Sequence, residues 1–172
     1  LVSRLRPKNG RLEPETWIAR TREEILSAQT SIYLDFPLVP HILRMKELAG
    51  RYAVVGLPCQ LAAVRRLERK HPKLAERIAY RLGLLCGHAT KRRLLDRVLQ
   101  KKGIPQDQIE DFAFRRGHWR GRTYVRLKDG REITFPFLHF GIYQNLWLYC
   151  ARRCLACEDH FAEQSDMSFG DA

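Results

Sequence analysis

Two short apolar runs constrain the fold most, because each ends in a turn and carries a cysteine at or just beyond that turn. The runs are "RYAVVGLP" at 51–58 and "RIAYRLGLLCG" at 77–87. Both are rich in aliphatic side chains with little alternation, which is typical of strands buried on both faces. Between them, "CQLAAVRRLERK" places Leu61, Val64 and Leu67 on one face of a helix. A strand, a helix and a strand in this order predict two parallel neighbouring strands.

Three further segments have the signals of helices. Residues 21–29 begin with Thr21 and have a glutamate three residues later, which is the pattern of a capping box. Residues 37–48 have helical apolar spacing, and so do residues 90–103, for which Thr90 is the expected N-cap and a glycine the expected stop.

The segment after these helices predicts a small antiparallel sheet. Residues 109–117, 122–130 and 131–137 are short strand-like runs, and the turn at 128–131 contains Gly130, which tolerates positive φ. A short helix over 140–150 is expected next. The predicted fold class is α/β: a layered, mostly parallel sheet with helices, plus a small antiparallel β meander and a cysteine-rich C-terminal segment.

The charge and composition of the 172 residues limit the classes of function. The net charge is +12, which favours anionic partners such as nucleic acid, phosphorylated cofactors or acidic proteins. Most of the basic residues fit the polar faces of helices, and the sequence has no RNA-binding motif and no finger spacing. No apolar run is long enough to cross a membrane, and the first residues do not have the pattern of a signal peptide, so we expect a cytoplasmic protein.

The five cysteines are the best candidates for chemistry. An odd number without a sign of secretion does not predict a disulfide framework. Cys59 and Cys86 each follow one of the two predicted strands, so both are expected at the carboxyl edge of the sheet, where open α/β sheets bind ligands. Cys59 also begins a helix, whose dipole would favour its thiolate. Cys154 and Cys157 have CxxC spacing, which can bind one metal or cluster.

Several interpretations of this four-cysteine set remain open at this point. Cys59 or Cys86 alone would be read as a small buried hydrophobic residue. The CxxC pair alone could be half of a zinc site or a redox pair. Zinc more often uses two close pairs, whereas here two of the cysteines stand alone, so the spacing favours an iron–sulfur cluster over zinc. Cys150 is the spare cysteine and could replace one of the four.

Four motifs together resemble a known family. They are "AVVGLPCQLAAVRRLE", "LGLLCGH", "FRRGHWRG" and "CLACEDHFAEQSDMSFGDA", in this order. They are similar to the coenzyme F420 hydrogenase/dehydrogenase beta-subunit family, and the resemblance runs from about residue 21 to the C-terminus. On this resemblance, 1–50 would be the end of the family's N-terminal segment and 51–172 its C-terminal domain, as one compact unit. The chain would then be a fragment that lacks the start of the N-terminal segment and the continuation after "GD".

The resemblance implies an oxidoreductase subunit with FAD and a [4Fe-4S] cluster that exchanges electrons with coenzyme F420 or a similar hydride carrier. Its partners would be redox subunits or a ferredoxin-like electron carrier. The implied cluster ligands are Cys59, Cys86, Cys154 and Cys157, and His88 is a candidate acid. The implied flavin-site residues are Ser31, Tyr33, Gly56, Pro58, Gln60, Gly87, Arg115, Arg116, Gly117 and Asp159. The alternatives are a zinc-stabilised, basic nucleic-acid-binding domain and an electron-transfer module without flavin.

Overall fold

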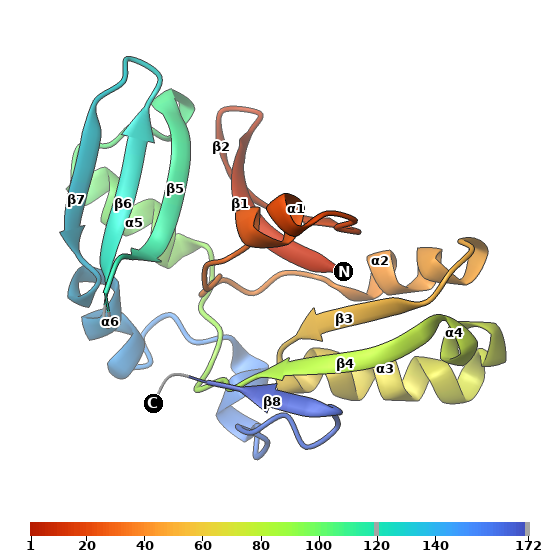
Figure 1. Cartoon of the computed structure of the whole chain (residues 1–172). Coiled ribbons are helices and arrows are strands. Elements are labelled where there is room, and N and C mark those ends of the chain that lie inside the picture. The colour runs from red at the N-terminus through yellow and green to blue at the C-terminus, as the bar shows by residue number, and fades with distance from the viewer. Residues whose placement is uncertain (119–120, 171–172) are drawn as a thin grey trace.

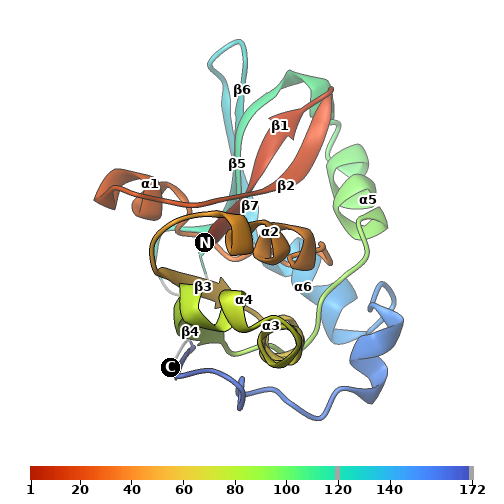
Figure 2. The same cartoon turned by 90° about the vertical axis from the view of Figure 1, so that its right-hand side faces the viewer.

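A three-stranded parallel sheet forms the lower part of the molecule in Figure 1. The computed structural model describes residues 1–118 and 121–170. Strands β3 (Tyr52–Gly56), β4 (Ile78–Leu84) and β8 (Met167–Phe169) lie in the order β3-β4-β8, and both pairs are parallel. Helices α3 (Pro58–Lys70) and α4 (Pro72–Arg77) connect β3 to β4 and pack on one face of the sheet (Figure 2). The predicted strand–helix–strand unit is confirmed.

Helix α3 forms where the apolar spacing and the turn chemistry agree. Its start is stabilised by Pro58 at the first turn and by the Gln60 side chain, whose oxygen accepts a hydrogen bond from the Leu57 amide at 2.9 Å. Its apolar face includes Leu61 and Val64, both fully buried against Val54 of β3 and residues of α2 (Val39–Arg44).

A buried ion-pair network ties α3, β4 and β8 together. Arg81 of β4 donates from Nε to Glu68 Oε2 at 3.2 Å and pairs through Nη2 with the other carboxylate oxygen. Its Nη1 also pairs with Asp166, just before β8, at 3.2 Å, and Asp166 accepts from the Arg81 amide at 2.7 Å. Because Arg81 and Glu68 are about nine-tenths buried, each charge depends on the other for compensation.

The second part of the molecule is an antiparallel sheet with its own helices. Strands β5 (Ile109–Arg116), β6 (Arg122–Leu127) and β7 (Glu132–Pro136) form the predicted meander, and its turn has Gly130 at φ 84°. Helix α5 (Arg93–Lys101) and helix α6 (Leu138–Asn145) pack on this sheet. The whole part lies between β4 and β8 in sequence.

Three features differ from the sequence prediction. A hairpin of β1 (Val2–Lys8) and β2 (Arg11–Trp17), which the sequence analysis did not identify, packs on β5. The α5 helix covers the meander and not the parallel sheet, and it begins after Arg92, because Thr90 instead bonds to the backbone of Tyr33. The predicted helix over 37–48 is a short α2 followed by a 3₁₀ turn, Met45–Glu47.

The remaining short elements follow the sequence more closely. Helix α1 (Arg22–Ser27) starts at Thr21, whose hydroxyl accepts a hydrogen bond from the Glu24 amide as expected. Two further 3₁₀ turns are Gln106–Gln108 and Arg152–Ala156. Across the described residues, no helix has both the length and the apolar character needed to span a membrane.

Candidate functional site

The carboxyl edge of the parallel sheet brings Cys59 and Cys86 to the same side of the molecule. Gly56 ends β3 and is paired with Gly83 near the end of β4. Cys59 is the second residue of α3, and Cys86 lies two residues after β4. The strand order therefore places both thiols where the sequence analysis expected them.

The segment that carries Cys154 and Cys157 is joined to this edge by main-chain hydrogen bonds. Ala151 donates to the Ala89 carbonyl at 3.0 Å, and Cys86 donates to the His160 carbonyl at 3.0 Å. The Ala89 amide also points at Cys154 Sγ, at 3.5 Å. These contacts hold the C-terminal segment against the residues that follow β4.

The four thiols are close enough for each to influence the others. Burial raises the pKa of Cys86 to about 11, and the thiols of Cys59, Cys154 and Cys157 add to this rise. Burial also raises the pKa of Cys59, with further increases from Cys154 and Cys157, although Arg153 opposes the rise. The expectation that the helix dipole favours the Cys59 thiolate stays a prediction, and burial acts in the opposite direction.

The chemistry of this set is that of a soft-metal site. Thiolates are preferred ligands of zinc and of iron–sulfur clusters. Within residues 1–118 and 121–170, no three Cys, His, Asp or Glu side chains converge as ligands of a single ion. A cluster does not require such convergence, because each of its thiolates binds a different iron atom.

Cys150 has a different environment from the other four. It is buried, and its thiol donates to the carbonyl of Ala151 at 3.3 Å. It also interacts with Cys154, and burial raises its pKa. These contacts are those of a packed structural thiol.

His88 lies next to the cysteine edge and is stacked on Trp147, with 4.4 Å between the ring centroids. Trp147 adopts a left-handed backbone conformation, with φ 58°. Burial lowers the pKa of His88, although a hydrogen bond to the backbone of Gln144 acts in the opposite direction. Its Nε2 is buried and has no hydrogen-bond partner among the described residues. His88 is therefore held mainly neutral, and its role as an acid stays a prediction.

The residues expected to contact flavin fall into two groups. Gly56, Pro58, Gln60 and Gly87 lie at the cysteine edge. Gly87 faces open space, whereas Gln60 is used structurally, by capping α3 and donating to the Phe36 carbonyl at 3.4 Å.

The second group lies around the end of β5. Arg115 donates to the Tyr33 hydroxyl at 2.9 Å, and Arg116 lies 4.2 Å above the Tyr124 ring. Gly117 adopts φ 88°, and the exposed Ser31 lies two residues before Tyr33. The contacts of Tyr33 and the two arginines stabilise the meander, which is a structural use of these residues.

Asp159 belongs to neither group. Its carboxylate accepts hydrogen bonds from the amides of Phe161 at 3.1 Å and Glu163 at 3.3 Å, so it shapes the turn after Cys157. Asp171 of the "GD" motif lies outside the described residues.

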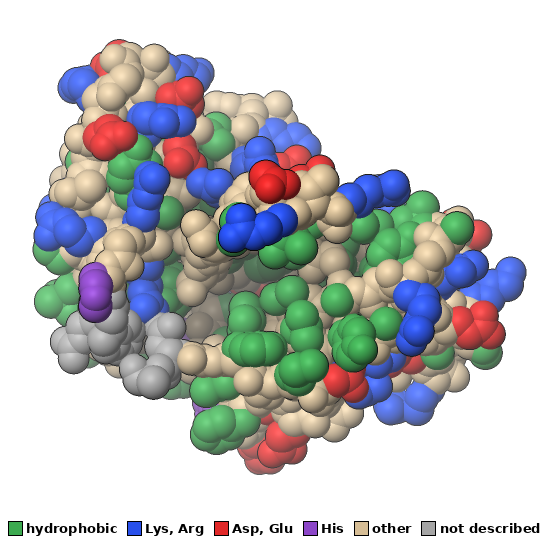
Figure 3. Space-filling view, in the orientation of Figure 1, with side chains coloured by type: hydrophobic (Ala, Val, Ile, Leu, Met, Phe, Trp, Pro, Cys, Tyr) green, Lys and Arg blue, Asp and Glu red, His purple; other side chains and the backbone are tan. Residues whose placement is uncertain are grey.

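One face of the parallel sheet is apolar and uncovered. Tyr80, Leu84, Met167 and Phe169 are exposed by 54, 39, 51 and 50%. Figure 3 shows hydrophobic side chains gathered over β4 and β8, beside a hollow that separates this part from the hairpin and α1. Parallel sheets are usually covered on both faces, so this face is suited to an apolar ligand or partner. The apolar run of β4 predicts a strand buried on both faces, and the structure differs by leaving this face exposed.

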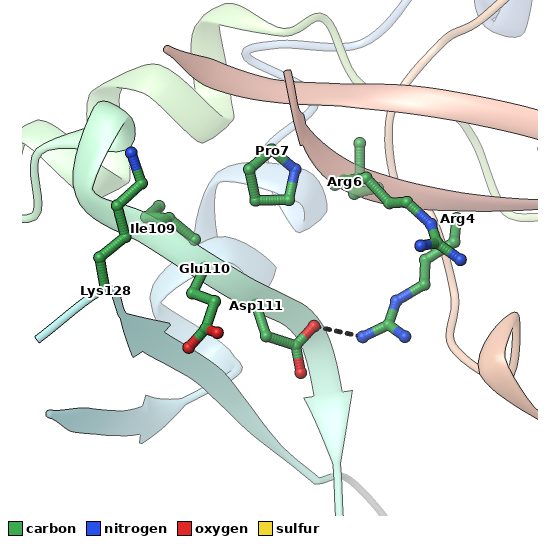
Figure 4. Close-up of a pocket in the computed structure, with 8 residues that line it drawn as sticks. Arg4, Arg6, Pro7, Ile109, Glu110, Asp111 and Lys128 are labelled. Atoms are coloured by element: carbon green, nitrogen blue, oxygen red, sulfur yellow. Dashed lines mark hydrogen bonds and ion pairs between the residues drawn. The ribbon is translucent and has the colours of Figure 1, made fainter. Parts of the chain in front are cut away.

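A cavity of about 340 Å³ lies elsewhere, between β1 and β5. It is lined by charged residues of both signs, and Arg4 pairs with Asp111 across it (Figure 4). Its position places it away from the cysteine edge, on the antiparallel part of the molecule.

Comparison with known sequences identifies the family. The sequence model that describes the C terminus of the coenzyme F420 hydrogenase/dehydrogenase beta subunit matches residues 49–172. The chain belongs to this family. The match includes all five cysteines and begins close to the start of β3.

Curated relatives of this F420 hydrogenase/dehydrogenase family are longer than the chain. The chain is 26% identical to the F subunit of the F(420)H(2) dehydrogenase from Methanosarcina mazei, and the alignment covers 95% of the chain and 44% of that protein. It is 29% identical to the coenzyme F420-dependent sulfite reductase of Methanocaldococcus jannaschii, covering 92% of the chain and 26% of that protein. The chain thus spans less than half of these two relatives.

A solved structure has the same fold. It is a chain of the F420-reducing [NiFe] hydrogenase complex from Methanosarcina barkeri, with a TM-score of 0.65 and 21% sequence identity. The match covers 99% of the present chain and 57% of the hydrogenase chain. The likeness shows that the parallel sheet, the meander and the cysteine-rich segment form one known arrangement.

Proposed function

We propose that this chain is part of a flavin- and iron–sulfur-dependent oxidoreductase, which exchanges electrons between reduced coenzyme F420 or a similar hydride carrier and a partner protein. Family membership gives the reaction class, an oxidoreductase with a role in electron transfer. The observation that supports the cofactor proposal is that three distant segments carrying the four thiols are joined at the carboxyl edge of the parallel sheet.

The donor set fits a [4Fe-4S] cluster. Cys59, Cys86, Cys154 and Cys157 supply the four thiolates that such a cluster uses. Burial and the neighbouring thiols raise the pKa of Cys59 and of Cys86, so these two are unfavourable as thiolates until a positively charged group compensates them. Iron supplies that charge, and the cluster would supply single-electron transfer.

The flavin is proposed to lie beside this edge. The open space at Gly87 and the uncovered apolar face of the sheet provide room and an apolar surface for a planar ring. Flavin would supply the hydride chemistry, while Gly56, Pro58, Gln60 and Gly87 would position it. Tyr33 and Arg115 would contact it from the meander side.

The positive charge suits the proposed substrate and partners. A net charge of +12 attracts an anionic hydride carrier or an acidic, ferredoxin-like electron carrier. One named relative is a dehydrogenase subunit, and the solved structure with the same fold belongs to a hydrogenase complex, which supports redox partner subunits. A cytoplasmic location remains part of this proposal.

The test is anaerobic purification of the full-length protein, followed by assays of iron, sulfide, zinc and flavin and of the oxidation of reduced F420. Iron, flavin and F420 oxidation together are the predicted result. Iron without flavin would instead indicate an electron-transfer module, and zinc without iron a zinc-stabilised nucleic-acid-binding domain. Either result would overturn the proposal.

A further inference from the structure

The C-terminal cysteine segment contains an arginine that is anchored from a distant part of the chain. Arg153 immediately precedes Cys154, and its guanidinium forms a two-point ion pair with Asp35. The Nη1–Oδ2 distance is 2.7 Å, and the second contact joins Nη2 to Oδ1. Such a fork fixes the plane of the guanidinium as well as its position.

Asp35 is itself held close to the cysteine edge. Its amide donates to the Thr90 carbonyl at 2.9 Å, and the preceding residue, Leu34, forms a β-bridge with Thr90. Thr90 also forms a bridge with Cys150 on its other side. Asp35 is therefore fixed relative to both segments that supply thiols after β4.

The charge of the anchored guanidinium also acts on the two thiols that follow the strands, Cys59 and Cys86. Arg153 opposes the rise in the pKa of Cys59, and its charge acts in the same direction on the pKa of Cys86. Since the side chain of Arg153 is half exposed, solvent weakens its longer-range effects, and its position directly before Cys154, fixed by the fork to Asp35, is the stronger basis. Hydrogen bonds to the sulfurs and local charge both set the potential of an iron–sulfur cluster.

We infer that Arg153, held beside Cys154 by Asp35, is a fixed cation that raises the reduction potential of the cluster. The inference rests on the proposed function, because it requires a cluster on the four cysteines. Reduction adds one electron to the cluster and makes it more negative. The nearby cation stabilises the reduced form more than the oxidised form and gives up no proton, so its removal lowers the potential.

The test compares Arg153→Gln with Arg152→Gln in the full-length protein, purified anaerobically. Arg152 is the matched control, because it is the neighbouring exposed arginine and its substitution changes the net charge equally. The readouts are iron per chain, the electron paramagnetic resonance spectrum of the reduced cluster, and a redox titration with dithionite and mediator dyes. None of these readouts requires catalytic turnover.

The expected result is a cluster that is harder to reduce in Arg153→Gln only. At the wild-type midpoint, the ratio of reduced to oxidised cluster should fall by about tenfold, which is 59 mV for a one-electron couple. Arg153→Lys should fall in between, since the charge remains and the fork is lost. In an Asp35→Asn background the effect of Arg153→Gln should shrink, because the two residues act as one unit.

Equal potentials in the wild type and Arg153→Gln would overturn the inference, and so would an equal shift in Arg152→Gln. If Arg153→Gln assembles no cluster, the reduction potential of Arg153→Lys is the deciding measurement. A potential equal to that of the wild type contradicts the inference, and a lower potential supports it. A wild-type protein without iron would refute the proposed function itself, which is a separate and distinguishable result.

Discussion

Replacing Glu68 with glutamine tests the buried network that holds β8, and with it the C-terminal segment, against the sheet. The substitution keeps the size of the side chain but removes its charge. Glu68 is 8% exposed and makes two contacts to the guanidinium of Arg81, which is 10% exposed. One of these contacts would become an unfavourable approach of two N–H donors.

The expected loss is about 3 kcal/mol of unfolding free energy. Breaking a buried ion pair costs about 3–5 kcal/mol, because the remaining charge stays buried. The lower end applies here, since Asp166 still accepts from Arg81 at 3.2 Å. For a chain of this size, about 3 kcal/mol corresponds to a fall in Tm of roughly 6–12 °C.

Urea unfolding followed by circular dichroism measures this loss. The control is Glu76→Gln, the same change at an exposed position of α4, which should stay within about 0.5 kcal/mol of the wild type. A loss below about 1 kcal/mol in Glu68→Gln, or an equal loss in both variants, would refute the account of the network.

Three further predictions follow from the same structure. Gly83→Ala should lower the unfolding free energy by about 1–3 kcal/mol and lower the iron content, because the new Cβ would lie 2.4 Å from the Cβ of Ala162. The control Gly87→Ala places its Cβ in open space and should leave the unfolding free energy unchanged in the same urea unfolding experiment. Burial opposes ionisation of Asp166, but the hydrogen bonds and charge of Arg81 outweigh it and lower the pKa of this carboxyl. As the pH falls, this carboxyl is therefore protonated in the unfolded state before it is protonated in the folded state, so the unfolding free energy should decline below about pH 4. The decline should be smaller in Asp166→Asn, and equal declines in the two proteins would contradict this prediction. Raising the salt concentration should slow the oxidation of reduced F420 if the charge of +12 steers the anionic carrier, and rates that do not change with salt would exclude steering.

The parallel core could be predicted because local signals agree there. The aliphatic runs of β3 and β4, the buried face of α3 and the turn residues all indicate the same arrangement, and strand order then brings Cys59 and Cys86 together. The CxxC pair was visible from its spacing. That its segment lies against the residues after β4 depends on main-chain contacts such as Ala151–Ala89, which no local pattern encodes.

The remaining features depend on long-range contacts. The β1–β2 hairpin alternates charged residues with few apolar ones, and its burial comes from packing on β5, as for the fully buried Leu12. The α5 helix has a clear apolar face, but the sequence does not say which sheet that face covers. Asp35 and Arg153 are 118 positions apart, so only the folded chain reveals their pairing.

Iron and acid-labile sulfide per chain test the central claim most directly. The account predicts four of each in the wild type and in Cys150→Ser, whose thiol is a packed structural group, and their loss in Cys59→Ser with the native fold retained in circular dichroism. An unchanged cluster spectrum and iron content in Cys59→Ser would contradict the claim that the four cysteines form one site.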